Sequence, residues 1–332
     1  MQPVKITFIR GDFAEEEHWA DVIKTAADGS VQAVYGDGEG CTFWRSAAKP
    51  FQALPFVAEG GMDRYGLTDK ELALMVSSHG GETRHVLTLQ NILQKIGLTA
   101  EDLQCGAVYP LNKRAAMKCL REGKEKSVLY NPCSGKHVQI LALCRLYGWS
   151  TENYYLPEHP AQCWILRHIA VAAGLSKAEI SCGIDGCGVP VFYLPLANMA
   201  FAYARLGKPS EGRWGSYAEA VSRIGTAMVE NPLMVAGTGM FDTVLMEVTG
   251  GRIIAKTGTD AVYCLADRQQ GYGLALKVRD GSFRAVPQLV IQLLWQWQSL
   301  TGEEYQKLNK IFPAALSNHR QENIGRIIVE VE

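Results

Sequence analysis

Ser46 and Lys49 are the first pair in this chain whose residue types and spacing can do chemistry. Two residues three positions apart at the start of a helix lie on one face, about one turn from each other. A serine there sits in the field of the free N–H groups that begin the helix. A partly buried lysine beside another cation can lose its proton near neutral pH and act as a base. We therefore predict a serine nucleophile with a lysine base, and the backbone N–H of Lys49 as an oxyanion donor.

Lys256-Thr257-Gly258 is a second motif, and it strengthens the first. It falls at the end of a strand predicted over 252–256. A helical S-x-x-K followed by K-T-G on a strand is typical of the penicillin-recognising serine hydrolases. In that arrangement the strand lies beside the nucleophile, and its lysine and threonine bind substrate. The alternatives are a serine that caps a helix, a solvated lysine and a plain turn, but the two motifs in this order favour a serine–lysine enzyme.

Ser77-Ser78-His79 precedes two glycines, which permit a tight turn with polar side chains converging on it. Spacing alone favours a simpler interpretation of this segment. In that interpretation a helix ends here, and Glu82 or Thr83 caps the next helix.

Cys133 and Cys187 each lie in a glycine-containing loop, where a thiolate can be stabilised. Two thiolates with a nitrogen donor can bind a zinc ion. The C-x-x-C and H-x-x-x-H spacings of common zinc sites are absent, so the residues alone make metal binding the minor alternative. Asp185, in the same loop as Cys187, can instead hold the ammonium group of a ligand.

The elements that must position these residues begin and end with strands. Alternating or apolar runs predict strands over 4–9, 31–35, 252–256, 261–265, 273–278 and 325–331. Apolar residues at three- and four-residue spacing predict helices over 46–59, 69–75, 84–96, 136–147, 160–173, 195–206, 217–229 and 286–300. This order predicts an α+β fold, with an antiparallel sheet built from both chain ends and an inserted helical region. Because no repeat or linker is present, residues 1–332 are expected to form a single catalytic domain.

Charge and composition limit the partners and the compartment. A net charge of -1 and a pI near 6.7 argue against nucleic acid or membrane as the main partner, and fit a small neutral or zwitterionic ligand. Nine cysteines, an odd number, are expected to stay as thiols in a reducing compartment. The N-terminus meets acidic residues too soon to form a signal peptide. These features predict a cytoplasmic location.

Taken together, several motifs resemble those of the rhizobial-type (class three, thermolabile) L-asparaginases, in family order across nearly the whole chain. They are Arg45 to Gln52, Ser77-Ser78-His79, Cys133 to His137, Asp185 to Pro190, Asn231-Pro232, Ala236-Gly237, Phe241-Asp242-Thr243 and Lys256-Thr257-Gly258. Members of this family resemble serine β-lactamases and glutaminases in fold. The resemblance implies hydrolysis of L-asparagine to L-aspartate and ammonia through a serine acyl-enzyme, in a homodimer without an organic cofactor.

The resemblance also implies roles for the matching residues. Two serine–lysine tandems are implied, Ser46 with Lys49 and Ser78 with Lys256. Ser46 is the preferred nucleophile, with Ser78 as its competitor, and the other tandem relays protons or positions the nucleophile. Substrate binding is implied for Arg45, His137, Asp185 and Gly186, and zinc binding for Cys133, Lys136 and Cys187. A lysine ligand must lose its proton, so zinc binding at this site is expected to depend on pH.

Three short segments depart from the family pattern. Gly80 stands where the family often has Ser, and Thr259-Asp260 replaces the more usual Ala-Glu. Pro132 removes a backbone N–H from the loop before Cys133.

Two other functions stay open at this point. One is a penicillin-recognising β-lactamase or peptidase, which would need export. The other is a non-catalytic amino-acid or metal sensor, which its ligand would stabilise without turnover.

Overall fold

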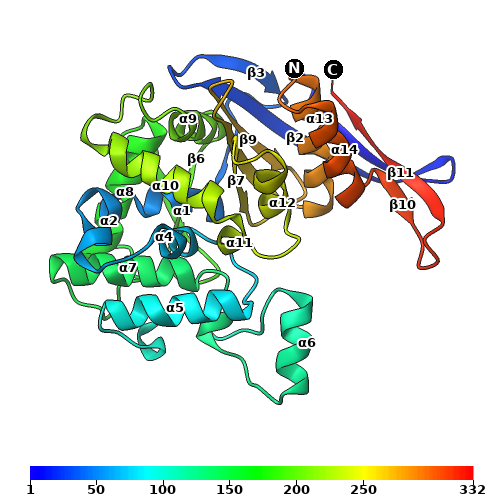
Figure 1. Ribbon diagram of the computed structural model, residues 1–332. Coiled ribbons are helices and arrows are strands. Elements are labelled where there is room, and N and C mark those ends of the chain that lie inside the picture. The colour runs from blue at the N-terminus through cyan, green and yellow to red at the C-terminus, as the bar shows by residue number, and fades with distance from the viewer. Residues whose placement is uncertain (332) are drawn as a thin grey trace.

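The computed structural model describes residues 1–331 and is built around one large antiparallel sheet (Figure 1). In spatial order its strands are β10 (Ala315–Ser317), β11 (Asn323–Glu330), β1 (Val4–Arg10), β2 (Phe13–Ala26), β9 (Tyr272–Val278), β8 (Val262–Asp267) and β7 (Ile253–Gly258), and β3 (Val31–Tyr35) pairs with β2. The first and last long strands of the chain are neighbours, with Thr7 opposite Ile328. The predicted α+β fold, with an antiparallel sheet built from both chain ends, is therefore confirmed.

The centre of the large sheet is buried. Every residue of β8 is buried, which explains why this strand is almost entirely apolar up to Asp267. Helix α9 (Leu196–Gly207) packs on β2, β8 and β9. A Cβ atom at Gly273 would lie 2.0 Å from the carbonyl oxygen of Ala200, so glycine is what allows this close approach. Helix α12 (Phe241–Val248) packs on β7 and brings its first turn to the end of that strand.

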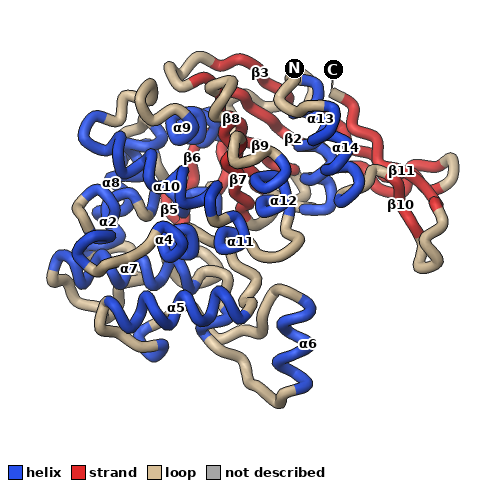
Figure 2. The backbone as a smooth tube through the Cα atoms, in the orientation of Figure 1, coloured by secondary structure: helices blue, strands red, loops and turns tan. Residues whose placement is uncertain are grey.

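Helices fill the region inserted between the two sets of strands (Figure 2). Besides α9 and α12, the α-helices are α1 (Lys49–Gln52), α2 (Leu54–Ala58), α3 (Gly61–Arg64), α4 (Asp69–Met75), α5 (Thr83–Lys95), α6 (Lys113–Arg121), α7 (Ser134–Tyr147), α8 (Pro160–Ala173), α10 (Ala218–Glu230), α11 (Pro232–Val235), α13 (Val286–Gln296) and α14 (Gly302–Ile311). The short 3-10 helices are η1 (Arg45–Ala48), η2 (Ala100–Asp102), η3 (Val128–Tyr130), η4 (Lys177–Glu179), η5 (Gly215–Tyr217) and η6 (Phe283–Ala285).

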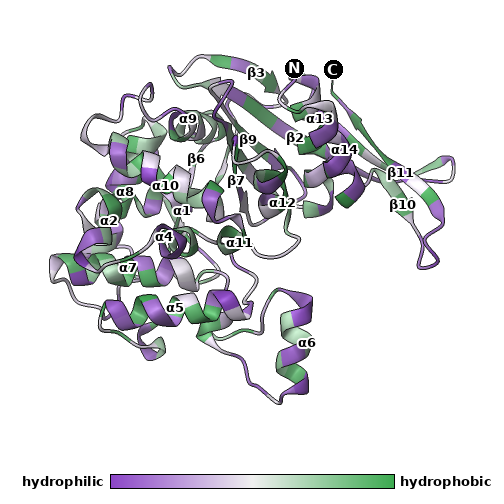
Figure 3. Cartoon of the chain, viewed as in Figure 1, coloured by the Kyte–Doolittle hydropathy of each residue, from purple (hydrophilic) through white to green (hydrophobic). Residues whose placement is uncertain are grey.

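Position in the fold decides whether a helix is buried all round or on one side only. Helix α7 is buried at every position from Ser134 to Cys144, so it is a core helix. Helix α5 is amphipathic, with Leu89, Ile92 and Leu93 among its buried residues, and it shows both colours in Figure 3. Within residues 1–331, no helix is both long enough and apolar enough to cross a lipid bilayer.

A second sheet of three short strands lies among the helices. Its order is β4 (Cys41–Phe43), β6 (Pro190–Pro195) and β5 (Ser181–Ile184). The turn between β5 and β6 carries Asp185 and Cys187. No sequence pattern predicted this sheet, because its strands are too short to show a clear alternation.

Two predicted helices differ from the structure. The helix expected over 46–59 is broken into η1, α1 and α2, because Pro50 and Pro55 each begin a new piece. The helix expected over 286–300 ends at Gln296, and a new helix starts at a capping box formed by Thr301 and Glu304. The other predicted helices occur with ends shifted by a few residues.

Candidate active site

Ser78 lies between two lysines in the connection from α4 to α5. The amine of Lys49 donates to Ser78 Oγ at 3.0 Å, and the amine of Lys256 donates to the same oxygen at 2.9 Å. The backbone N–H of Ser78 donates to the carbonyl of Val235 at 2.8 Å, which fixes the residue from α11. A hydroxyl oxygen can accept two hydrogen bonds and still donate one. The Ser78 proton is therefore left free to be donated elsewhere.

The two lysines are buried, and they have no carboxylate partner among the described residues. Lys49 also donates to the carbonyls of Ser77 at 2.6 Å and Pro132 at 3.4 Å, and Lys256 donates to that of Thr257 at 2.9 Å. Burial disfavours the charged form of each amine and so lowers the pKa of both, that of Lys256 to about 7. A lysine with such a pKa can accept and return a proton at neutral pH.

Asp242 is a buried carboxylate that adjoins this cluster. It accepts hydrogen bonds from the backbone N–H of Thr257 at 2.8 Å and from the Thr257 hydroxyl at 2.6 Å. Burial has the largest effect on the pKa of Lys256 and lowers it, whereas the charge of Asp242 acts in the opposite direction and raises it. No sequence pattern predicted a role for Asp242, although it lies in one of the motifs that carry the family resemblance. Its function depends on the packing of α12 against β7, which local spacing does not encode.

Ser46 and Ser78 line the same cavity, whose volume is about 280 Å³. The Ser46 hydroxyl makes no hydrogen bond to another described residue. Lys49 therefore makes its serine hydrogen bond to Ser78 Oγ and not to Ser46. The backbone N–H of Lys49 donates to the carbonyl of Ser46, so its predicted role as an oxyanion donor is wrong. The N–H of Ala47 is the first to bond within the helix, to Trp44 at 3.2 Å. The N–H of Ser46 comes before it, and so has no partner within the helix.

Strained backbone gathers around this cavity. Arg45, Asp260 and Ala261 have positive φ angles of 53°, 60° and 54°, in the left-handed region that side chains other than glycine rarely adopt. Arg45 directly precedes Ser46, and the other two follow the Lys256 strand. Strain of this kind costs about 1–3 kcal/mol per residue and occurs often at functional sites.

Arg45 and Asp185 place opposite charges beside Ser46. Arg45 Nη1 lies 3.4 Å from Asp185 Oδ1, and its Nη2 lies 3.5 Å from the carboxylate of Asp260. Arg45 Nε is buried without a hydrogen-bond partner. The two contacts to carboxylates are long, and the side chain keeps 19% of its surface exposed. The guanidinium is therefore suited to hold an anionic group of a ligand.

His79 and His85 stabilise the Ser78 turn from behind. Their rings stack with centroids 5.0 Å apart. In each ring Nδ1 accepts a backbone N–H, from Gly81 and Glu82 respectively, so the proton of each neutral ring lies on Nε2. His79 Nε2 then donates to the Ser134 hydroxyl at 2.8 Å, and His85 Nε2 donates to a carbonyl of α11. Burial lowers the pKa of both rings, so they act as fixed neutral supports.

A sequence model of the family described as L-asparaginase II matches residues 6–329, nearly the whole chain. The chain belongs to the L-asparaginase II family. No curated protein matches it in sequence. Among solved structures, it is similar to a β-lactamase from Mycobacterium bovis, with 14% identity and a TM-score of 0.44 over 84% of this chain and 94% of that chain. A mutant simvastatin synthase from Aspergillus terreus gives 13% identity and a TM-score of 0.39, over 78% and 86%. The assignment depends on the family match, since both TM-scores are below 0.5.

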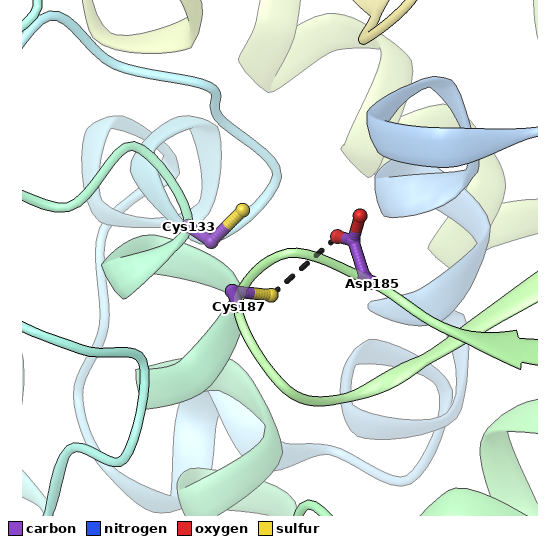
Figure 4. Close-up of side chains that lie close together, drawn as sticks. All are labelled: Cys133, Asp185 and Cys187. Carbon is purple, nitrogen blue, oxygen red and sulfur yellow. Dashed lines mark hydrogen bonds between the residues drawn. The ribbon is translucent and has the colours of Figure 1, made fainter.

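In this L-asparaginase II family member, two of the residues implied as metal ligands, Cys133 and Cys187, lie close to Asp185, which the resemblance implied only for substrate binding. Cys133 caps the start of α7, and Asp185 and Cys187 lie in the β5–β6 turn (Figure 4). Their sulfur and oxygen atoms all lie within 4.8 Å of one another, and the Cys187 thiol donates to Asp185 Oδ2 at 3.4 Å. Lys136 Nζ lies 3.0 Å from the same carboxylate oxygen. Gly186, which has no side chain, lies in the turn between Asp185 and Cys187.

Charges of both signs lie side by side in this cluster. Burial alone would lower the pKa of Lys136, but the negative charges of Cys133, Cys187 and Asp185 raise it. A hydrogen bond from the Cys187 thiol lowers the pKa of Cys133, and the charges of Lys49 and Lys136 lower it further. The pKa of Cys187 is raised. The cluster therefore holds one thiolate, one carboxylate and one ammonium group.

The donor set fits a zinc ion. Two buried sulfurs within 4.8 Å of each other match the thiolate pairs of tetrahedral zinc sites. Lys136 is an ion-pair partner of Asp185 in the structure, so its amine could ligate only after losing its proton. Zinc therefore stays a prediction for this L-asparaginase II family member, with the carboxylate of Asp185 as an additional candidate donor.

His137 is fully buried on α7. Its Nδ1 shares a hydrogen bond of 2.7 Å with the hydroxyl of Tyr154, and its Nε2 has no partner among the described residues. Burial lowers its pKa, so the ring is neutral. His137 does not line the cavity that Ser46 and Ser78 share, so its predicted substrate contact stays a prediction.

Proposed function

We propose that this protein hydrolyses L-asparagine to L-aspartate and ammonia through an acyl-enzyme on Ser46, with Ser78 as the proton relay between Lys49 and Lys256. Membership of the L-asparaginase II family supports an amidohydrolase. The observation that carries the mechanism is one hydroxyl, Ser78 Oγ, which accepts from two buried lysines at a cavity that a second serine also lines.

Ser46 is the better nucleophile because its oxygen is unoccupied. The lone pairs of Ser78 each face an amine, which suits a group that passes protons. The hydroxyl of Ser46 has no hydrogen-bond partner among the described residues and lies at the cavity. Its backbone N–H, left unbonded by the helix start, is placed to donate to the oxygen of an amide that the same residue attacks.

The steps balance with these groups alone. Ser46 Oγ bonds to the side-chain amide carbon, and its proton passes by way of the Ser78 hydroxyl to a neutral lysine amine. Ser78 donates its own proton to the amide nitrogen as the C–N bond breaks, and it is reprotonated by the lysine. Ammonia leaves, and the aspartyl group stays as an ester on Ser46. Water then attacks the ester through the same relay, which releases L-aspartate and restores the serine.

The charged groups near Ser46 match the two charged groups on the substrate's α-carbon, the carboxylate and the ammonium group. The α-carboxylate would bind the guanidinium of Arg45, whose side chain keeps 19% of its surface exposed. The α-ammonium would bind Asp185, whose pKa burial alone would raise but which Lys136 and Arg45 lower, so that it stays ionised. The Arg45–Asp185 and Arg45–Asp260 contacts of 3.4 and 3.5 Å are long enough for a substrate to rearrange them.

Zinc, when bound, would be held by Cys133 and Cys187, with the deprotonated amine of Lys136 or the carboxylate of Asp185. It would supply a fixed positive charge beside the substrate-binding carboxylate. No step above requires it. The homodimer and the cytoplasmic location stay predictions, and so does the single catalytic domain. The described apolar residues form one continuous cluster, which supports one domain.

Hydrolysis of asparagine, glutamine and a β-aspartyl peptide tests this function, with ammonia measured for the first two substrates and the released amino acid for the third. We expect asparagine to be the best of the three, and a chromogenic β-lactam to be neither hydrolysed nor covalently bound. No ammonia from asparagine, with or without zinc, would contradict the proposal. Turnover of the β-lactam would favour a penicillin-recognising enzyme. Stabilisation by asparagine without turnover would favour a sensor.

A further inference from the structure

The outer wall of the Ser46–Ser78 cavity is apolar. Leu111, Met240 and Phe283 line it, the first two from the connections before α6 and α12 and the third from the start of η6. Leu111 is 62% exposed and Met240 is 44% exposed, although both are large hydrophobic side chains. Apolar side chains exposed together around a pocket are typical of a ligand-binding surface. L-asparagine is polar at every end, so it gains nothing from this wall.

The wall is attached to the Ser78 turn. The backbone N–H of Ser78 bonds to Val235, directly before the cavity-lining Ala236, at 2.8 Å. The N–H of Asn112, which directly follows Leu111, bonds to the carbonyl of Gly80 at 2.9 Å. The apolar side chains are therefore placed by the same segment that carries the proton relay.

The relay determines which part of a substrate meets this wall. Ser78 delivers a proton to the leaving nitrogen, so that nitrogen must lie on the Ser78 side of the cavity. The charged end of the substrate lies on the other side, with Arg45 and Asp185, neither of which lines the apolar cavity. A substituent on the amide nitrogen would thus project against Leu111 and Met240. The cavity volume of about 280 Å³ is close to the lower limit for drug-sized ligands, roughly 300 Å³, and leaves room for such a group.

We propose that the enzyme also hydrolyses β-aspartyl amides whose nitrogen carries an apolar alkyl or arylalkyl group. This inference rests on the proposed asparaginase function. The bonds change as for asparagine: Ser46 Oγ bonds to the carbonyl carbon, and the C–N bond breaks. The proton from Ser78 goes to the substituted nitrogen, so a primary amine leaves in place of ammonia. Water then releases L-aspartate.

The test compares kcat/KM for three substrates: L-asparagine, N-benzyl asparagine with the benzyl group on the side-chain amide, and β-aspartylglycine. We expect stoichiometric benzylamine and aspartate from the second, and a preference for it over β-aspartylglycine, whose substituent is charged. In Leu111→Ser and Met240→Ser, the kcat/KM ratio of N-benzyl asparagine to asparagine should fall about tenfold, as expected for a lost apolar contact.

Leu87→Ser is the matched control, because Leu87 is 60% exposed on α5 and does not line this cavity. Its ratio should equal that of the unmodified protein. Hydrolysis of asparagine without hydrolysis of N-benzyl asparagine would overturn the inference and leave the proposed function standing. The inference would also be overturned if the kcat/KM ratio of N-benzyl asparagine to asparagine were unchanged in both cavity variants. An equal fall of that ratio in Leu87→Ser would overturn it too. Failure to hydrolyse any of the three substrates would overturn the proposed function itself.

Discussion

Two buried lysine clusters lie next to each other in this fold, and the same side chain behaves differently in each. Lys256 has only hydroxyl and carbonyl oxygens within hydrogen-bond distance, and burial lowers its pKa to about 7. Lys136 lies 3.0 Å from the carboxylate of Asp185 and beside two cysteines, and its pKa is raised.

The difference shows that the hydrogen-bonding partners, rather than burial, decide what a buried lysine does. Both amines are withdrawn from water, which penalises their charged form. Around Lys136, neighbouring negative charges outweigh this penalty, and the result is a stable ion pair. Around Lys256 they do not, so its amine can lose and regain a proton near neutral pH. The first cluster is suited to hold a structure or a metal, and the second to move protons.

The largest expected effect separates the two serines of the reactive cluster. Ser46→Ala should lower kcat for asparagine by about 10⁴-fold or more, because the nucleophile is lost. Ser78→Ala should lower it by about 10²- to 10³-fold, as expected for the loss of a general acid–base relay. Steady-state ammonia release measures both, with thermal melting as the control for folding. A smaller loss in Ser46→Ala than in Ser78→Ala would reverse the assigned roles.

The next effect compares the same replacement, lysine by methionine, in the two clusters. Lys136→Met removes one member of a buried ion pair and should lower the free energy of unfolding by about 3–5 kcal/mol. Lys256→Met removes an amine without a carboxylate partner, so its free energy of unfolding should stay within about 1 kcal/mol of the original while activity is lost. Urea denaturation monitored by fluorescence measures each value. Equal destabilisation of the two variants would refute the distinction between the clusters.

Zinc should act on the Lys136 cluster. At a free zinc concentration about 100 times its Kd, binding to the folded protein should stabilise it by about 2.7 kcal/mol, which chelator reverses. Cys187→Ser is the control and should show no zinc-dependent rise in melting temperature. If zinc stabilises neither protein, the cysteine cluster is not a zinc site.

The smallest effect concerns pH. Lys256 reacts in its neutral form, so kcat/KM should rise with pH through about 7. The charge of Asp242 raises the pKa of Lys256, so Asp242→Asn should move this rising limb to lower pH, by about one unit. Asp260→Asn is the control, because that carboxylate is 65% exposed on the same cavity. A shift to higher pH in Asp242→Asn would contradict the account.

The sequence allowed the sheet to be predicted because period-two and apolar runs occur at both chain ends. The resemblance placed Ser78 beside Lys256, and their atoms lie 2.9 Å apart. The partner of Lys49 was not predictable from local spacing, because the continuous helix expected over 46–59 is broken into η1, α1 and α2. Long-range contacts were also hidden, above all the bond from Thr257 on β7 to Asp242 on α12.

The central claim is that Ser46 carries the acyl group while Ser78 only relays protons. The most direct measurement is peptide mapping by mass spectrometry after acid quench during asparagine turnover. An asparagine analogue with a diazoketone in place of the amide serves as a second, irreversible label. We predict that each reagent labels the peptide that contains Ser46. The labelling should occur in the unmodified protein and, more slowly, in Ser78→Ala. An adduct on Ser78, or labelling of Ser46→Ala at the original rate, would contradict the account.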